Sequence, residues 1–262
     1  MPIRNVHVNA GSELILRQLF DRFGDQVHLL TPTYPLFSEI ARRYSETRLR
    51  PERDFAFDLA GLEIPPRTSL VVIVNPNNPT GQVFDLSAMP GLLRSYPDTR
   101  FLVDEAFIGL AGETVASRVP EYTNLLVTRT LSKAHSLAGF RVGYAVLPDA
   151  LADDLNRHND AYPLARPSQA AALATLKNEE QIHARNRKLR AWTGALAREL
   201  RALGVRTFPT ETYFFLADFA PHDATRLAAQ LRERGIYIKP LNDTRLGAGY
   251  MRVTTALPED NA

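Results

Sequence analysis

Lysine is scarce in this chain, and the position of one lysine points to amine chemistry. Lysine and arginine together number 31, but only four are lysines, at positions 133, 177, 188 and 239. Lys133 comes after an apolar run and the segment Thr130-Leu131-Ser132. An amine that is desolvated, or that lies near a second cation such as Arg141, has a lowered pKa and becomes nucleophilic. Lys133 is therefore the candidate for covalent bonding to a carbonyl compound, whereas the other three lysines fit exposed or structural positions.

Other polar residues follow apolar runs in the same way. Asp104 comes directly after the run at 101–103, and Asn78 lies in the turn-forming segment 75–81. Taken alone, an aspartate at a strand end is as readily explained as a helix cap, and an asparagine before proline as a turn residue. Their chemistry becomes specific only if the fold brings them to Lys133.

The spacing of apolar runs predicts such a fold. Short runs rich in valine, leucine and isoleucine alternate with segments of helical periodicity, which is typical of a mainly parallel sheet sandwiched by helices. The expected strands are at 27–30, 70–74, 101–103, 125–127 and 144–147, and the expected helices are at 12–23, 36–44 and 86–96. Parallel strands place their carboxyl ends at one edge, where ligands bind. The polar residues after these runs should therefore form one site.

The pattern changes after Pro148 and predicts a smaller C-terminal α+β domain. Helices are expected at 151–158, 167–203 and 223–234, and strands at 213–219, 236–238 and 250–254. We expect one domain over residues 1–165 and a second over 166–262, which begins with a linking helix.

Four motifs, in this order along the chain, resemble those of a known family. They are Asn-Pro-Asn-Asn-Pro-Thr-Gly at 75–81, Asp-Glu-Ala-Phe at 104–107, Thr-Leu-Ser-Lys-Ala-His-Ser-Leu-Ala-Gly-Phe-Arg-Val-Gly at 130–143 and Met-Arg-Val-Thr at 251–254. Together they resemble the fold type I aminotransferases that use pyridoxal 5'-phosphate, and most of all the histidinol-phosphate aminotransferase branch. The resemblance extends from about residue 6 to the end of the chain. It implies the transfer of an amino group between an amino acid, such as one similar to histidinol phosphate, and a 2-oxo acid such as 2-oxoglutarate, by a cytoplasmic homodimer.

The resemblance also implies a role for each matching residue. Lys133 would bond to the cofactor aldehyde and move the proton at the substrate Cα, while Asp104 would keep the pyridine nitrogen protonated. Arg252 would bind the substrate carboxylate as a bidentate pair. The other cofactor contacts would be Tyr34, Asn78 and Phe107 at the ring, and Ser132, Arg141 and the backbone of Gly11, Ser12 and Glu13 at the phosphate.

The chain departs from the family pattern in ways that keep alternatives open. Phe107 lacks the hydroxyl that a tyrosine usually supplies there, and the same Asp-Glu-Ala-Phe segment occurs in the related threonine-phosphate decarboxylases. The N-terminal arm of the family and part of its C-terminal domain are expected to be absent. The alternatives are therefore an amino-acid-phosphate decarboxylase or a non-catalytic module of the same fold. A nucleotide-binding domain is disfavoured because neither glycine-rich phosphate motif is present.

Composition excludes several other classes. A net charge of +2 gives no broad field for binding nucleic acid, and the absence of cysteine excludes disulfides and thiolate metal sites. No apolar run approaches the roughly 18 residues of a membrane span. We expect neither a metal nor a membrane partner.

Overall fold

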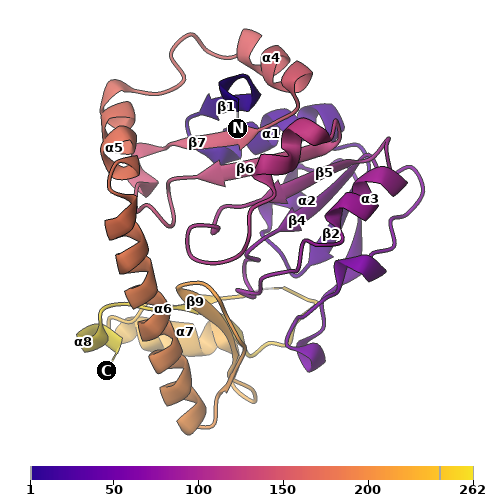
Figure 1. The fold of residues 1–262 in the computed structure, drawn as a ribbon. Coiled ribbons are helices and arrows are strands. Elements are labelled where there is room, and N and C mark those ends of the chain that lie inside the picture. Colours follow the sequence, from indigo (N-terminus) through magenta and orange to yellow (C-terminus); the bar gives the residue numbers. More distant parts are fainter. Residues whose placement is uncertain (1, 242, 262) are drawn as a thin grey trace.

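A seven-stranded sheet forms the centre of the larger part of the computed structural model, which describes residues 2–241 and 243–261 (Figure 1). Its order is β1-β7-β6-β5-β4-β2-β3. The strands are β1 (Val6–Asn9), β2 (Val27–Thr31), β3 (Tyr44–Arg48), β4 (Leu70–Val74), β5 (Arg100–Asp104), β6 (Leu125–Thr130) and β7 (Gly143–Val146). Five adjacent strands, β6, β5, β4, β2 and β3, run parallel, while β7 and β1 are antiparallel to their neighbours. The prediction of a mainly parallel sheet is confirmed.

Helices cover both faces of this sheet because its central strands are apolar on both sides. In β4, Val71 and Ile73 belong to one buried cluster, whereas Leu70, Val72 and Val74 belong to another. The side chains of α3 (Met89–Ser95) pack in the first cluster. The second cluster contains side chains of α1 (Ser12–Phe23), α2 (Leu36–Ile40) and α4 (Asp149–Arg157).

A second, antiparallel sheet of four strands lies in the C-terminal part, in the order β10-β11-β9-β8. The elements here are α5 (Arg166–Leu176), α6 (Glu179–Ala202), β8 (Arg206–Thr207), β9 (Phe214–Asp218), α7 (Ala224–Glu233), β10 (Lys239–Pro240), β11 (Tyr250–Thr254) and α8 (Pro258–Asn261). Helix α6 extends from α5, beside the large sheet, down to the small one (Figure 1). We propose that the division between the two domains falls between residues 165 and 166, where α5 begins.

Short 3-10 helices complete the description. They are η1 (Ile3–Asn5), η2 (Pro51–Arg53), η3 (Leu59–Gly61), η4 (Ala116–Glu121) and η5 (Ala138–Phe140). Among the described residues, no helix combines the length and the apolar character needed to cross a bilayer.

Three predicted elements differ from the structure. The helix expected at 36–44 ends at Ile40, and edge strand β3 follows it. This strand is polar and half exposed, and the His28 imidazole binds the hydroxyls of Ser45 and Thr47 at 2.8 and 2.9 Å. Its pairing therefore depends on polar contacts that an apolar pattern does not reveal. The helix expected at 167–203 is divided into α5 and α6, and the strand expected at 236–238 is replaced by β10. Strands β1 and β8 were not predicted.

Gly143 allows the start of α1 to lie against β7, and its replacement tests this packing. A Cβ at this position would lie 2.1 Å from the Ser12 backbone nitrogen and 2.3 Å from the Gly11 carbonyl carbon. Since these are backbone atoms, we expect Gly143→Ala to lower the free energy of unfolding by about 2 kcal/mol or more. Urea unfolding measures this change.

The matched control is Gly91→Ala, because Gly91 lies in α3 and a Cβ there has nothing within 4 Å. Alanine favours a helix over glycine by about 1 kcal/mol, so this variant should be neutral or slightly stabilised. Equal stabilities of the two variants would contradict the close approach at Gly143.

Candidate active site

The loops that follow four parallel strands are linked at the carboxyl edge of the large sheet. After β2 and β4, the Thr33 hydroxyl donates to the Asn77 side chain at 3.3 Å, and Asn77 Nδ2 donates to the Pro32 carbonyl at 3.0 Å. After β5, the Glu105 amide donates to the Thr128 carbonyl of β6 at 2.8 Å. The residues expected to form one site thus come from loops that contact one another.

Lys133 lies in the loop between β6 and η5, and its surroundings lower its pKa. Its Nζ is 5.8 Å from the centroid of the Phe107 ring. Partial desolvation by the loops is the main cause of the lowered pKa, followed by the positive charges of Arg252 and Arg141, while Asp104 acts in the opposite direction. The residue is nevertheless exposed, so its side chain still reaches solvent. A larger fraction of this amine is therefore neutral and reactive than for an ordinary lysine.

Asp104, at the end of β5, is a buried carboxyl close to this amine. The side chain is 4% exposed and accepts a hydrogen bond from the Thr128 hydroxyl at 2.9 Å. Burial raises its pKa to about 6, and the neighbouring charge of Glu105 adds to this shift. Glu105 itself is paired with Arg129 at 2.7 Å. Asp104 is therefore a buried acid without a strong cationic partner, and a cation beside it would stabilise its charged form.

Arg141 and the start of α1 form a cradle suited to an anion. The Arg141 guanidinium donates to the Ser132 hydroxyl at 3.3 Å. It also lies against Gly11, where a Cβ would come within 2.3 Å of its Nη2 and where the φ of +89° favours glycine. Helix α1 has no side-chain cap, and the amides of Ser12 and Glu13 are in its first turn, where no helical acceptor exists. A cation beside open amides favours a phosphate-like group.

At this cradle one expected donor, the Gly11 amide, is already used within the protein, and the Glu13 side chain is paired as well. The Gly11 amide donates to the Asn9 carbonyl at 2.7 Å, so it is not available to an anion. The Glu13 side chain pairs with Arg17 at 2.8 Å along α1, so only its backbone can take part.

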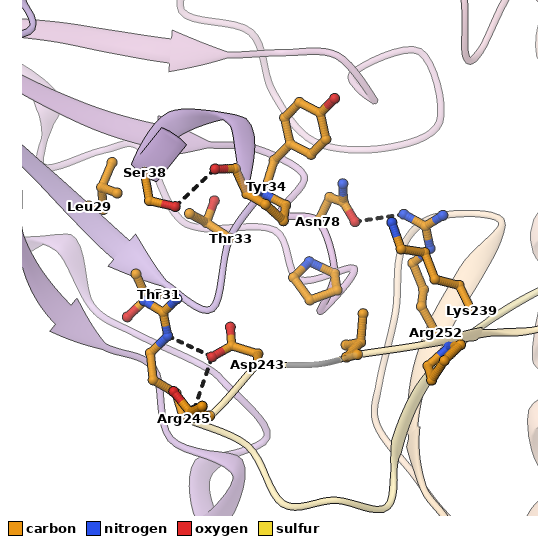
Figure 2. A pocket seen from close by; sticks show the side chains of 15 residues that line it. Leu29, Thr31, Thr33, Tyr34, Ser38, Asn78, Lys239, Asp243, Arg245 and Arg252 are labelled. Carbon is orange, nitrogen blue, oxygen red and sulfur yellow. Dashed lines mark hydrogen bonds and ion pairs between the residues drawn. The ribbon is translucent and has the colours of Figure 1, made fainter. Parts of the chain in front are cut away.

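Arg252 reaches the cleft from β11 of the small sheet. Its Nη1 donates to Asn78 Oδ1 at 2.9 Å (Figure 2). Its guanidinium carbon lies 5.1 Å from the Phe214 ring centroid. Burial lowers its pKa. Within residues 2–241 and 243–261, its buried Nε has no hydrogen-bond partner and no acid pairs with the guanidinium. An unsatisfied buried donor on a cation is the feature expected of a site that waits for an anionic ligand.

A pocket of about 370 Å³ extends from Asn78 and Arg252 to the segment after β10 (Figure 2). Its polar lining residues are Thr31, Thr33, Tyr34, Ser38, Asn78, Lys239, Asp243, Thr244, Arg245 and Arg252. Arg245 is neutralised by Glu46 at 2.6 Å and by Asp243 at 2.7 Å. Lys239 pairs in register with Arg252 across β10 and β11, and no acid pairs with Lys239 in the described part of the chain. The pocket therefore presents two cations without counter-charges.

The two aromatic residues of the expected site pack against different neighbours. Tyr34 lines the pocket, with its ring edge-on to Phe37 at 5.9 Å. Burial, with the negative charges of Glu13 and Asp104, raises its pKa. Phe107 packs against Phe214 at 5.1 Å, on the side of the small sheet.

Lys239 is the residue that the sequence analysis did not place at the site. It was interpreted as a structural residue before a proline. The sequence gives one indication that Lys239 is unusual, because the chain has only four lysines. Its register opposite Arg252 is known only from the structure. No group of three or more histidines, aspartates and glutamates in the described residues is arranged to hold a metal.

Comparisons with known proteins agree on one family. The model of class I and II aminotransferases matches residues 5–262. The histidinol-phosphate aminotransferase of Gluconacetobacter diazotrophicus is 34% identical over 97% of this chain and 73% of its own length. Histidinol-phosphate aminotransferase 1 of Pseudomonas aeruginosa is 32% identical over 98% of this chain and 74% of its own.

Solved structures share the fold. A Thermus thermophilus aspartate aminotransferase double mutant has a TM-score of 0.82 at 27% identity, over 98% of this chain and 73% of its own. The histidinol-phosphate aminotransferase of Sinorhizobium meliloti, in complex with pyridoxal-5'-phosphate, has a TM-score of 0.85 at 23% identity, over 98% of this chain and 77% of its own. The L-threonine-O-3-phosphate decarboxylase of Porphyromonas gingivalis has a TM-score of 0.87 at 23% identity, over 98% of this chain and 80% of its own.

Replacing Asp104 by asparagine tests the electrostatic cost of its burial in the cofactor-free protein. Its folded pKa of about 6 lies above the unfolded value. Below about pH 4 the carboxyl is neutral in both states and does not affect stability. As the pH rises from about 4 through about 6, the unfolded state ionises more readily than the folded one, so the free energy of unfolding falls. We expect Asp104→Asn to match the original protein near about pH 4 and to be more stable by about 2–3 kcal/mol near about pH 8. Urea unfolding at both pH values measures this; a variant less stable at the higher pH would contradict it.

Proposed function

This chain belongs to the family of class I and II aminotransferases, and we propose that it transfers the amino group of a phosphorylated donor of the histidinol-phosphate kind to a 2-oxo acid such as 2-oxoglutarate. It is an aminotransferase that depends on pyridoxal phosphate. The observation that carries the substrate proposal is the pair of cations, Arg252 and Lys239, that line one pocket without an acid partner in the described residues.

Two like charges opposite each other on neighbouring strands repel, so this pair favours a ligand with two negative charges. A phosphate ester carries about two charges near neutral pH. A dicarboxylic 2-oxo acid carries two as well. The donor and the acceptor occupy the same site in turn during transamination, and both could be held by the same two cations. Arg252 suits a bidentate pair, whereas Lys239 acts as a point charge.

The residues at the edge of the large sheet fit the cofactor, which presents a phosphate, an aldehyde, a ring nitrogen and a phenolic oxygen. The cradle of Ser12, Ser132 and Arg141 suits the phosphate. The buried carboxyl of Asp104, which has no strong cationic partner of its own, suits a protonated ring nitrogen. Asn78 and Tyr34 lie beside Arg252 at the pocket and suit the phenolic oxygen and the ring face.

The bound cofactor supplies an electron-poor ring that accepts the electron pair left at the substrate Cα. We assign to Lys133 the covalent hold on the aldehyde carbon and the movement of the proton at Cα, because its amine is neutral over a wider pH range than usual. Asp104 would hold the proton on the ring nitrogen through its negative charge. Arg252 would orient the substrate so that the Cα–H bond faces Lys133.

We also propose that the protein acts as a homodimer in the cytoplasm. Tyr162 and the α5 residues Leu173 and Leu176 are exposed apolar side chains. Exposed apolar side chains favour association with another surface.

The substrate proposal is tested by product analysis with three donors. With 2-oxoglutarate present, we expect glutamate to form from histidinol phosphate much faster than from histidinol. Release of carbon dioxide from threonine phosphate without glutamate formation would contradict the proposal and favour the decarboxylase alternative, for which Phe107 is the supporting observation.

Lys239→Gln should weaken the binding of the phosphate group specifically. We expect KM for histidinol phosphate to rise about tenfold or more, which corresponds to about 1.4 kcal/mol, while kcat/KM for histidinol changes little. Steady-state kinetics with both donors measure the difference. Lys177→Gln is the matched control because it removes a lysine of α5's C-terminal end, which does not line the pocket. An equal loss for both donors would show that Lys239 does not contact the phosphate.

Lys133→Ala should lose turnover because proton movement at Cα loses its amine. General acid–base groups contribute about 10²–10⁴-fold, so we expect a fall of about 10³-fold or more in the transamination rate. A small primary amine added to the variant should restore part of the rate. A variant that retains more than about a tenth of the original rate would contradict the assignment.

A further inference from the structure

Asn186, in the N-terminal half of α6, joins two loops of the site. Its side chain is 2% exposed, and its Nδ2 donates to the carbonyls of Gly109 at 3.0 Å and Ala134 at 3.2 Å. Ala134 is the residue directly after Lys133, and Gly109 belongs to the loop that also carries Phe107. One amide thus joins the loop that carries Lys133 to the loop that carries Phe107.

Arg185 strengthens this junction. It donates to Asn186 Oδ1 at 3.0 and 3.3 Å, to the Ser136 hydroxyl at 2.7 Å and to the Ala134 carbonyl. The two loops are also in direct contact, because a Cβ on Gly109 would lie 2.5 Å from the Ala134 Cβ. The position of the Lys133 backbone therefore depends on α6 as well as on β6.

The other end of α6 packs on the small sheet. Ala197 lies in a buried cluster with Phe215 of β9 and Val253 of β11, and its carbonyl accepts from the Thr207 hydroxyl at 3.4 Å. Val253 is the neighbour of Arg252 in the sequence. One helix therefore connects the loop that carries Lys133 to the strand that carries Arg252.

We propose that Asn186 is a positioning residue that sets the depth of Lys133 in the cleft and its separation from Arg252. The role of Lys133 in this inference rests on the proposed function. Desolvation and the charges of Arg252 and Arg141 lower the pKa of Lys133, and all three effects weaken with distance. A displaced loop would therefore return the amine toward its ordinary pKa.

A purely structural role for Asn186 makes a different prediction, and Asn124 provides the matched control. Asn124 is also buried, at 4% exposed, and its Nδ2 donates to the carbonyls of Leu93, Tyr96 and Thr99 at 3.0–3.2 Å. It precedes β6, at the end of the sheet opposite the site. Replacing either asparagine by leucine removes a buried donor from backbone carbonyls and should lower stability, although the Ala134 carbonyl would keep its hydrogen bond from Arg185. Only the change at Asn186 should alter Lys133.

The experiment measures the reactivity of Lys133 in the cofactor-free protein. The original protein, Asn186→Leu and Asn124→Leu are acetylated with limiting acetic anhydride across a pH series, and each lysine is quantified by peptide mass spectrometry, with Lys177 as the internal standard. We expect Asn186→Leu to lower the relative acetylation of Lys133 near neutral pH by about threefold or more, equivalent to a rise of about 0.5 in its pKa. Asn124→Leu should leave it unchanged.

Two outcomes would overturn the proposal: unchanged Lys133 reactivity in a folded Asn186→Leu protein, or an equal change in Asn124→Leu. If Asn186→Leu does not fold, Asn186→Ser, which can replace only one of the two hydrogen bonds, is measured in the same way and must also lower the reactivity. This measurement needs neither cofactor nor substrate. Failure of the proposed function would appear instead as a lack of transamination by the original protein, so the two failures are distinguishable.

Discussion

The chemistry of the site depends on a partly desolvated amine, Lys133, that lies among other cations. Lys133 lies within the electrostatic influence of Arg252 and Arg141, and the carboxylate of Asp104 only partly compensates for them. Partial desolvation is the main cause that lowers the pKa of this amine, and the neighbouring cations add to it, so the amine gives up its proton more readily than an ordinary lysine. The guanidinium groups keep their charge because arginine remains protonated at any ordinary pH. The same surplus of positive charge that makes Lys133 reactive also prepares the cleft and its pocket for anionic ligands.

The fold keeps these charges together against their repulsion. The large sheet brings the loops after β2, β4, β5 and β6 to one edge, and strands buried on both faces make that edge rigid. The small sheet brings Arg252 to the same cleft, with Phe214 beneath its guanidinium and Asn78 at its tip. Burial of Asp104 disfavours its charged form, which costs stability in the cofactor-free protein. The arrangement that suits ligand binding therefore lowers the folding stability of the cofactor-free protein, as is common at functional sites.

The sequence predicted the parts of this arrangement that depend on local patterns. Apolar runs located β2, β4, β5, β6 and β7, and the rule that ligands bind at the carboxyl ends of parallel strands selected the residues after four of them. Other parts depend on contacts between distant residues. Edge strand β3 is polar, and its pairing with β2 leaves no apolar pattern. Lys239 faces Arg252 only through the register of β10 and β11. The hydrogen bonds of Asn186 join residues 52 and 77 positions away, which no local pattern could indicate.

The identity of the lysine that bonds to the cofactor tests the account most directly. The purified protein is loaded with pyridoxal phosphate and reduced with borohydride, which makes the bond between amine and cofactor permanent, and the digest is analysed by mass spectrometry. Because the chain has four lysines, each can be examined separately. The account predicts the added mass on the peptide that contains Lys133. Addition to Lys177, Lys188 or Lys239 instead, or to none of the four, would contradict it.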